Sequence, residues 1–169
     1  MSRFYLNSFT LKDYILLLLP FLVSIVFMYT TNNIIQSIVF NSYLYYAIND
    51  AYLIQSFTKI NEMNRLGHLL IPRLGNKTFY LNTIKSSCVI ALVFFIFQYV
   101  FMVLVYGGIP VGYEKYVLLF TVCYVLVFVI MQSILCLQVG KKMNLIYLLL
   151  PIFLNLLFRY YFVEVYFAL

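Results

Sequence analysis

Five long apolar runs occupy most of this 169-residue chain, and they restrict its fold more than any other feature. The runs are Tyr14 to Tyr29, Ile34 to Phe57, Ser86 to Tyr106, Tyr116 to Val139 and Leu145 to Leu169. Only 9% of the residues are charged, whereas soluble domains contain about one quarter. Runs of this kind suit helices that cross a bilayer. The sequence therefore predicts an all-α, polytopic transmembrane helical bundle that forms a single domain over residues 1–169, with five spans.

Basic residues between the runs predict the orientation of the chain. Cytoplasmic loops of membrane proteins carry an excess of Lys and Arg. The expected arrangement has a cytoplasmic N-terminus and an external C-terminus, in a bacterial cytoplasmic membrane. In this arrangement Lys115 is the basic residue of an external loop, and the cytoplasmic segments hold Arg3, Lys12, Lys59, Arg65, Arg73, Lys77, Lys85, Lys141 and Lys142.

Two segments outside the spans have patterns of their own. Residues 1–13 mix basic and aromatic residues, which is typical either of an amphipathic helix along the membrane interface or of a disordered tail. Residues 58–85 separate spans 1–2 (residues 14–57) from spans 3–5 (residues 86–169) and form the largest polar segment. Within them, Lys59 to Leu70 is predicted to be a short helix that Pro72 and Gly75 end. Its apolar side would hold Ile60, Met63, Leu66 and Leu70.

The second span carries an unusual polar stripe. Asn33, Ser37, Asn41, Tyr45 and Asn49 recur every four residues, which places them along one side of a helix. Lipid cannot satisfy their hydrogen bonds, so this stripe is predicted to face other helices or a water-filled cavity.

Ionisable residues also fall inside the predicted spans. Asp50 lies beside the polar stripe, and Arg159 and Glu164 lie in the last run. Such residues are costly in a membrane and often functional. Structural pairing of Arg159, or extension of its side chain to the interface, is the competing interpretation.

No catalytic motif is recognisable. The chain has no HExxH, GxSxG or P-loop pattern, and its one histidine, His68, has only Cys88 as a conceivable partner in a membrane thiol peptidase. The three cysteines lie in apolar surroundings without metal-ligand spacing. We therefore predict a protein that is not an enzyme, with no catalytic residues, metal or cofactor, and with no nucleic-acid partner, since its basic residues flank spans instead of forming one surface.

The stretch Arg73 to Lys85 reads RLGNKTFYLNTIK and follows a polar second span. Together with the basic and aromatic N-terminal lead, it resembles small permease subunits of type-2 ABC exporters, especially those of bacteriocin or peptide export and immunity systems in Gram-positive bacteria. The resemblance covers residues 57–90 and the order of the spans.

This resemblance implies partners and sites. It implies an ABC ATPase subunit that receives a cytoplasmic coupling helix, a second permease subunit, the same chain or a different one, and surrounding membrane lipid. By position, the coupling element would be Glu62 to Pro72, with contact residues Ile60, Glu62, Met63, Arg65, Leu66 and Leu70. The substrate path would include Asn41, Tyr45, Asn49 and Asp50.

One departure from the family is the count of five apolar runs instead of six. Either the last run is a re-entrant hairpin around residues 155–159, or another subunit supplies the final helix. The expected function is that of a permease subunit for a peptide or amphipathic substrate. The alternatives are a non-transporting membrane subunit, such as an immunity protein or a structural subunit of a larger complex, and the membrane peptidase considered above. An interfacial loop that binds anionic headgroups is the alternative for residues 58–85.

Overall fold

A computed structural model describes residues 11–27, 42–106, 112 and 114–161. Its described part is entirely helical apart from turns and connections, which confirms the all-α prediction. The predictions for Asn33, Ser37, Asn41, Glu164 and most of the N-terminal segment lie outside the described residues. The helices are α2 (Leu11–Phe27), α3 (Ser42–Leu74), α4 (Asn76–Tyr106), α5 (Glu114–Cys136) and α6 (Ile146–Arg159).

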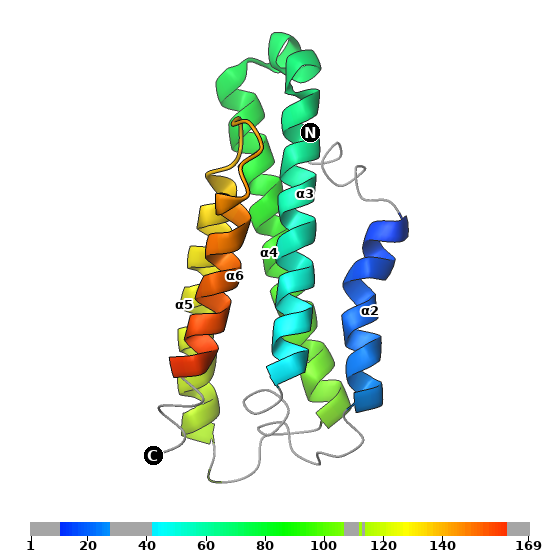
Figure 1. The fold of residues 1–169 in the computed structure, drawn as a ribbon, viewed down its shortest axis with the longest axis vertical. Helices are drawn as coiled ribbons and strands as arrows, with labels where there is room; N and C mark the ends of the chain where they lie inside the picture. The colour runs from blue at the N-terminus through cyan, green and yellow to red at the C-terminus, as the bar shows by residue number, and fades with distance from the viewer. Residues whose placement is uncertain (1–10, 28–41, 107–111, 113, 162–169) are drawn as a thin grey trace.

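The central helix of the bundle is α3, which contacts α2, α4, α5 and α6. Successive helices run in opposite directions (Figure 1). The start of α2, the α3–α4 connection and the α5–α6 connection therefore lie in the same half of the bundle. That half carries the described basic residues that were predicted to share one side of a membrane, namely Lys12, Lys59, Arg65, Arg73, Lys77, Lys85, Lys141 and Lys142.

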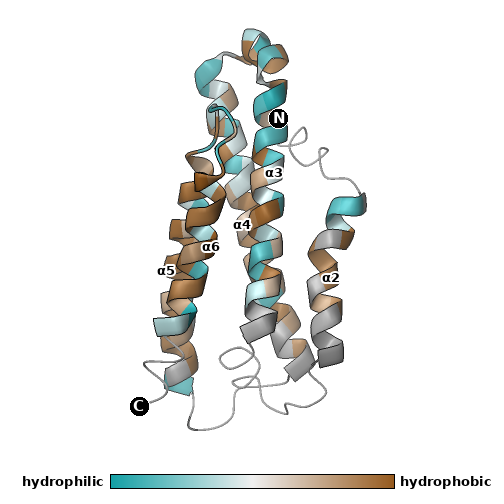
Figure 2. Ribbon diagram, viewed as in Figure 1, coloured by the Kyte–Doolittle hydropathy of each residue, from teal (hydrophilic) through white to brown (hydrophobic). Residues whose placement is uncertain are grey.

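Two of the helices are long and apolar enough to cross a membrane: α4 over Asn76–Phe101 and α5 over Val117–Cys136. Only 28% of the most apolar window of each is buried in the bundle, whereas the core helix of a soluble protein would be mostly buried. Figure 2 shows mainly apolar residues along α5 and α6, and polar residues both where α3 and α4 meet and at intervals along α3. Helix α6 is apolar but shorter, at 14 residues.

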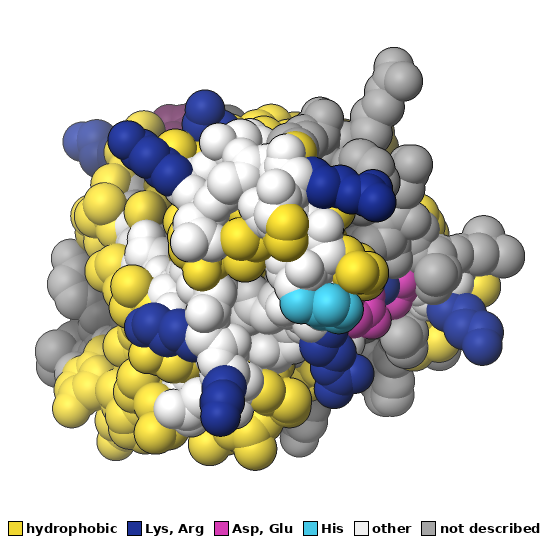
Figure 3. Space-filling model, turned by 90° about the horizontal axis from the view of Figure 1, so that it is seen from above, with side chains coloured by type: hydrophobic (Ala, Val, Ile, Leu, Met, Phe, Trp, Pro, Cys, Tyr) yellow, Lys and Arg dark blue, Asp and Glu magenta, His cyan; other side chains and the backbone are white. Residues whose placement is uncertain are grey.

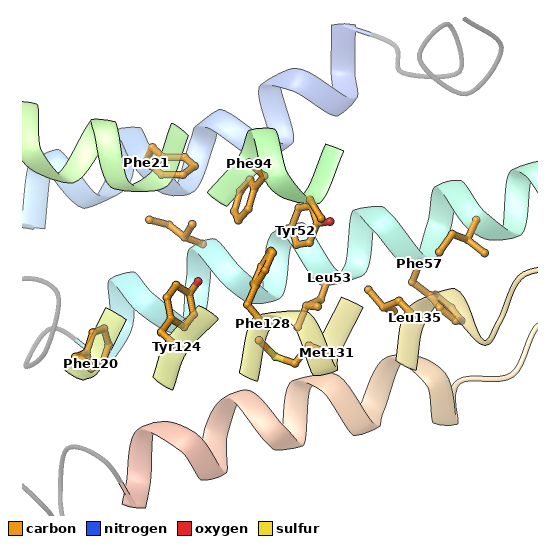
Figure 4. Close-up of a cluster of buried hydrophobic side chains, with 13 residues drawn as sticks. Phe21, Tyr52, Leu53, Phe57, Phe94, Phe120, Tyr124, Phe128, Met131 and Leu135 are labelled. Atoms are coloured by element: carbon orange, nitrogen blue, oxygen red, sulfur yellow. The ribbon is translucent and has the colours of Figure 1, made fainter. Parts of the chain in front are cut away.

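Aromatic side chains fill the space between the helices (Figure 4). The rings of Tyr52 and Phe94 stack with their centroids 4.3 Å apart, and Phe21 of α2 packs edge-on against Phe94 at 6.1 Å. On the other side, Phe128 and Tyr124 of α5 continue the cluster at 6.0 Å from each other. Rings in such arrangements contribute about 0.5–1.5 kcal/mol per pair beyond the area they bury.

The expected short helix from Lys59 to Leu70 does not exist as a separate element. These residues belong to the 33-residue helix α3, which continues through Pro72 to Leu74. Pro72 lies inside α3, two residues before its end, and does not stop the helix. Gly75 does, because its φ of 77° is a left-handed conformation that glycine adopts readily.

Helix α4 starts directly after Gly75, at Asn76, well before the predicted third span at Ser86. The end of α3 and the start of α4 form a helical elbow, defined here as residues 65–81. Figure 1 shows that this elbow extends beyond α2 and beyond the α5–α6 connection.

The α5–α6 connection is attached to α3 by Asn64. Its side-chain nitrogen donates to the carbonyl oxygens of Gln138 and Lys141 at 2.9 and 3.1 Å, and its oxygen accepts from the backbone nitrogen of Gly140 at 2.7 Å. Gly140 also has a φ of 77° and lies directly against the Tyr80 ring of α4. Asn64 thus helps to fix the α5–α6 connection to α3.

We expect Gly140→Ala to lower the free energy of unfolding more than Gly75→Ala. Both positions have the same φ, at which a side chain costs about 1–2 kcal/mol. A Cβ at Gly140 would also lie 2.4 Å from a Tyr80 ring carbon, whereas nothing lies within 4 Å of one at Gly75. The clash should add about 1–3 kcal/mol. Denaturant unfolding of both variants in detergent measures the difference, and equal losses would contradict the packing of this connection.

Candidate functional site

A chain of buried polar side chains crosses the middle of the bundle and joins four helices. Asn49 of α3 lies at its centre and is fully buried. Its side chain contacts Asn155 of α6 at 3.3 Å, the Tyr124 hydroxyl of α5 at 2.8 Å and, more distantly, Gln98 of α4 at 3.5 Å. Tyr124 also contacts Gln98 at 2.9 Å, and Asn155 donates to Asp50 at 3.1 Å. We call these five residues the polar chain.

The hydrogen bonds of Asn155 have a defined direction. The Asn155 nitrogen donates to an Asp50 oxygen, and the Asn155 oxygen accepts from the Asn49 nitrogen. The Asn49 oxygen accepts from the Tyr124 hydroxyl at 2.8 Å and from the Gln98 nitrogen at 3.5 Å. The same hydroxyl lies 2.9 Å from the Gln98 oxygen, and its single proton is donated to one of these two oxygens at a time.

A second polar group lies closer to the elbow. Gln132 of α5 accepts from the Tyr52 hydroxyl at 2.9 Å and donates to the Ser87 hydroxyl at 2.7 Å, which joins α3, α4 and α5. Further along, Gln138 donates to Asn61 at 3.1 Å. Buried polar groups at three levels thus connect α3 to its neighbours.

Helix α2 is held to α3 by an ion pair at its polar end. The Lys59 nitrogen lies 2.8 Å from carboxylate oxygens of both Asp13 and Glu62, and only 4% of its side chain is exposed. Burial lowers the pKa of Lys59, but its hydrogen bonds to Asp13 and Glu62 and their negative charges outweigh burial, so the net shift is upward. The stabilisation from this shift is complete below the usual lysine pKa and is lost only when the pH rises through the raised value.

Gln55 is a buried amide without hydrogen bonds among the described residues. It is 7% exposed, and neither its side-chain oxygen nor its nitrogen has a partner there, whereas Gln138 lacks a partner only for its oxygen. It precedes Lys59 by four residues and therefore lies on the same side of α3, the side that Lys59 turns toward α2. An unpaired buried amide costs about 1–3 kcal/mol, so the contact between α2 and α3 is not optimised for stability here.

A cavity of about 370 Å³ with both polar and apolar lining residues lies at the base of the elbow. Its walls come from α3, from the first turns of α4 and from the α5–α6 connection. Asn61, Asn64, Arg65, His68, Tyr80, Lys141 and Lys142 are among the residues that line it. Figure 3 looks onto this end of the molecule and shows Lys and Arg side chains spread around it.

The structure separates the residues of the predicted coupling element. Ile60 and Met63 are buried in the bundle, at 0% and 5% exposure, so they cannot form a free docking surface with Leu66. Glu62 is engaged with Lys59, and Leu70 is half-buried. Arg65 and Leu66 are exposed. A continuous α3 packs Ile60 and Met63 inside the bundle, and partner binding by these six residues stays a prediction.

The residues of the predicted substrate path are only partly described. Asn49 and Asp50 belong to the polar chain. Their side chains contact other helices, which is one of the two environments predicted for the polar stripe. Asn41 lies outside the described residues, and Tyr45 lies in α3 without a described side chain. Whether they form a path stays a prediction.

Several residues of the polar chain were not assigned to a site from the sequence. Gln98, Tyr124 and Asn155 each come from a different helix. The signal for Gln98 and Asn155 was an isolated amide in an apolar run, and Tyr124 had none. Arg159 is buried and lies with its guanidinium 5.4 Å from the centre of the Tyr46 ring. His68 and Cys88 line different cavities, so the structure does not bring this pair together.

Comparison of the chain with protein-family models, with curated proteins and with solved structures returned no match.

We expect Tyr124→Phe to lower the free energy of unfolding by about 1–2 kcal/mol, the upper range for hydrogen bonds between membrane helices. The change removes the hydroxyl that connects Asn49 to Gln98 and leaves both amides short of a partner. Tyr99→Phe is the matched control, because the Tyr99 hydroxyl makes a 3.2 Å contact to Thr121 in a half-buried position. Unfolding in detergent should show a smaller loss for the control. Equal losses would mean that the Tyr124 hydroxyl contributes no more to the free energy of unfolding than the Tyr99 hydroxyl does.

Proposed function

We propose that the chain is an integral membrane protein in which α4 and α5 cross the bilayer and α2, α3 and α6 belong to the other spans, about five in all. The apolar part of α4, Ser86–Tyr106, is about 30 Å long at 1.5 Å per residue, which matches the hydrocarbon thickness of a bilayer. Large apolar side chains are exposed all along this part, including Leu92 at 60% and Leu104 at 79%. Exposure of such a large apolar surface to water is unfavourable, whereas in a membrane lipid would cover it.

Within the membrane, the protein acts as a permease subunit of an ABC exporter for a peptide or another amphipathic substrate, driven by a separate ATPase subunit. The observation that supports this proposal is the elbow. It extends past the rest of the bundle (Figure 1), and it exposes Leu66, Leu69 and Leu81 by 44%, 58% and 46% beside basic side chains. Exposed leucines on a polar, protruding elbow favour a protein partner that covers them.

The elbow takes over the role first predicted for Glu62 to Pro72. A coupling element must contact the ATPase at one end and reach the spans at the other. Helix α3 meets both conditions without a break, since it runs from the elbow to the polar chain. Binding of the ATPase would shift the bundle between two arrangements by its different affinity for each, as in alternating access.

A non-transporting membrane subunit, such as an immunity protein or a structural subunit, is the second candidate. The observation that favours it is the closure of the polar chain. Asn49 is fully buried and hydrogen-bonded to the other helices, so a single copy in this conformation offers no open path at that level. The two candidates differ in whether this region opens during ATP hydrolysis.

We expect the double substitution Leu66→Asp and Leu69→Asp to abolish association with an ATPase. Each change places a charge in an apolar contact and should cost roughly 2–5 kcal/mol of binding free energy. Both side chains are exposed, so the fold should be unaffected. The measurement is purification from the native membrane in mild detergent, followed by mass spectrometry of the accompanying chains and by ATPase assay.

The matched control is the pair Leu66→Met and Leu69→Met, which keeps the apolar contact and should keep the partner. Recovery of an ATPase with the aspartate variant at the level of the unchanged protein would contradict the docking role of the elbow. A purified complex without any ATPase would contradict the permease proposal itself.

Opening of the bundle can be followed at Ser56, which is 5% exposed and lies seven residues, or two turns, from Asn49 on the same side of α3. We expect Ser56→Cys, in a chain whose native cysteines are changed to alanine, to resist polar thiol reagents at rest. Labelling should rise during ATP hydrolysis by the assembled complex if the protein is a permease. Unchanged protection during turnover, with the exposed control Lys142→Cys labelled throughout, would favour the non-transporting subunit.

A further inference from the structure

The cavity at the base of the elbow has an unbalanced charge. Arg65, Lys141 and Lys142 are among its lining residues, and no acidic residue of the described chain lines it. The nearest acid along α3, Glu62, is bound to Lys59 at 2.8 Å. A cavity with this lining attracts an anion.

The donors of the cavity are not equally available. Lys141 is already engaged, because its nitrogen donates to the Tyr147 hydroxyl at 2.9 Å and lies 4.8 Å from the centre of that ring. Arg65 and Lys142 have no ion-pair partner among the described residues. The side-chain amides of Asn61 and Asn64 are hydrogen-bonded to the α5–α6 connection. An anion in the cavity would therefore be bound by Arg65 and Lys142.

The position of the cavity indicates which kind of anion it binds. Directly beyond Lys142 the chain becomes apolar and exposed, with Met143 at 60%, Leu145 at 54% and Ile146 at 56%. The cavity therefore lies at the level where the polar end of the bundle meets its apolar surface. In a membrane this is the level of the lipid phosphates, and basic pockets between helices at that level bind anionic headgroups.

We propose that this cavity is a binding site for the phosphate group of an anionic phospholipid, held by Arg65 and Lys142. The planar guanidinium can bind two phosphate oxygens at once, and the lysine adds a point charge. The volume of about 370 Å³ is at the small end of ligand pockets and suits a headgroup, while the acyl chains would lie along the exposed apolar residues that follow Lys142. The proposal rests on the membrane location proposed above, and not on the ATPase.

A bound lipid would join two parts of the molecule. Arg65 and Tyr80 belong to the elbow and Lys142 belongs to the α5–α6 connection, and all three line the cavity. Occupation of the cavity would hold the elbow in a fixed position relative to α5 and α6. The lipid would therefore stabilise one arrangement of the elbow.

The test is native mass spectrometry of the purified protein in detergent, titrated with phosphatidylglycerol and, separately, with phosphatidylcholine of the same acyl chains. We expect a clear preference for phosphatidylglycerol, and a loss of about fivefold in its affinity for each of Arg65→Gln and Lys142→Gln. Lys142→Arg keeps the charge and should keep the affinity. The matched control is Arg73→Gln with Lys77→Gln, which removes two exposed charges of the same elbow outside the cavity.

Affinity that survives the Arg65→Gln and Lys142→Gln double variant would overturn the proposal. An equal loss in the control pair would also overturn it, because binding would then follow total charge. Binding of inorganic phosphate by the unchanged protein without binding of phosphatidylglycerol would overturn the assignment to lipid. No ATPase is present in this experiment, so its failure is distinguishable from failure of the permease proposal.

Discussion

Hydrogen bonds between side-chain amides of different helices are the interaction on which the rest of this bundle depends. In the proposed membrane location there is little hydrophobic gain in bringing two apolar helices together, so packing and polar contacts determine which helices meet. Asn49 provides such contacts to α5 and α6, and Gln132 provides them between α3, α4 and α5. The aromatic cluster of Tyr52 and Phe94 fills the space that these contacts define.

The sequence predicted the helices better than their contacts. Long apolar runs require helices because lipid offers the backbone no hydrogen bonds, and a stripe that recurs every four residues identifies Asn49 as facing inward. Neither signal says which helix lies opposite. Tyr124 and Asn155 are 75 and 106 residues away from Asn49, and only the folded chain brings them to it.

The failed prediction of a separate coupling helix has a physical reason. Charge marks where a chain leaves the apolar layer, but charge does not end a helix. Lys59 and Asn61 stay within α3 because their polar groups find partners in Asp13 and Gln138 and in their own helix. The helix ends where the backbone conformation changes, at Gly75, which the sequence did indicate.

Because α3 is continuous, it connects the elbow rigidly to the polar chain. Leu69 in the elbow and Asn49 in the polar chain are connected by about 30 Å of uninterrupted helix, at 1.5 Å per residue. A short helix joined by flexible loops would absorb a push applied at its tip, whereas a stiff rod pivots. Lys59, Asn61 and Asn64 attach α3 to its neighbours between these two ends, so a displacement of the elbow that reached Asn49 would also have to shift these contacts.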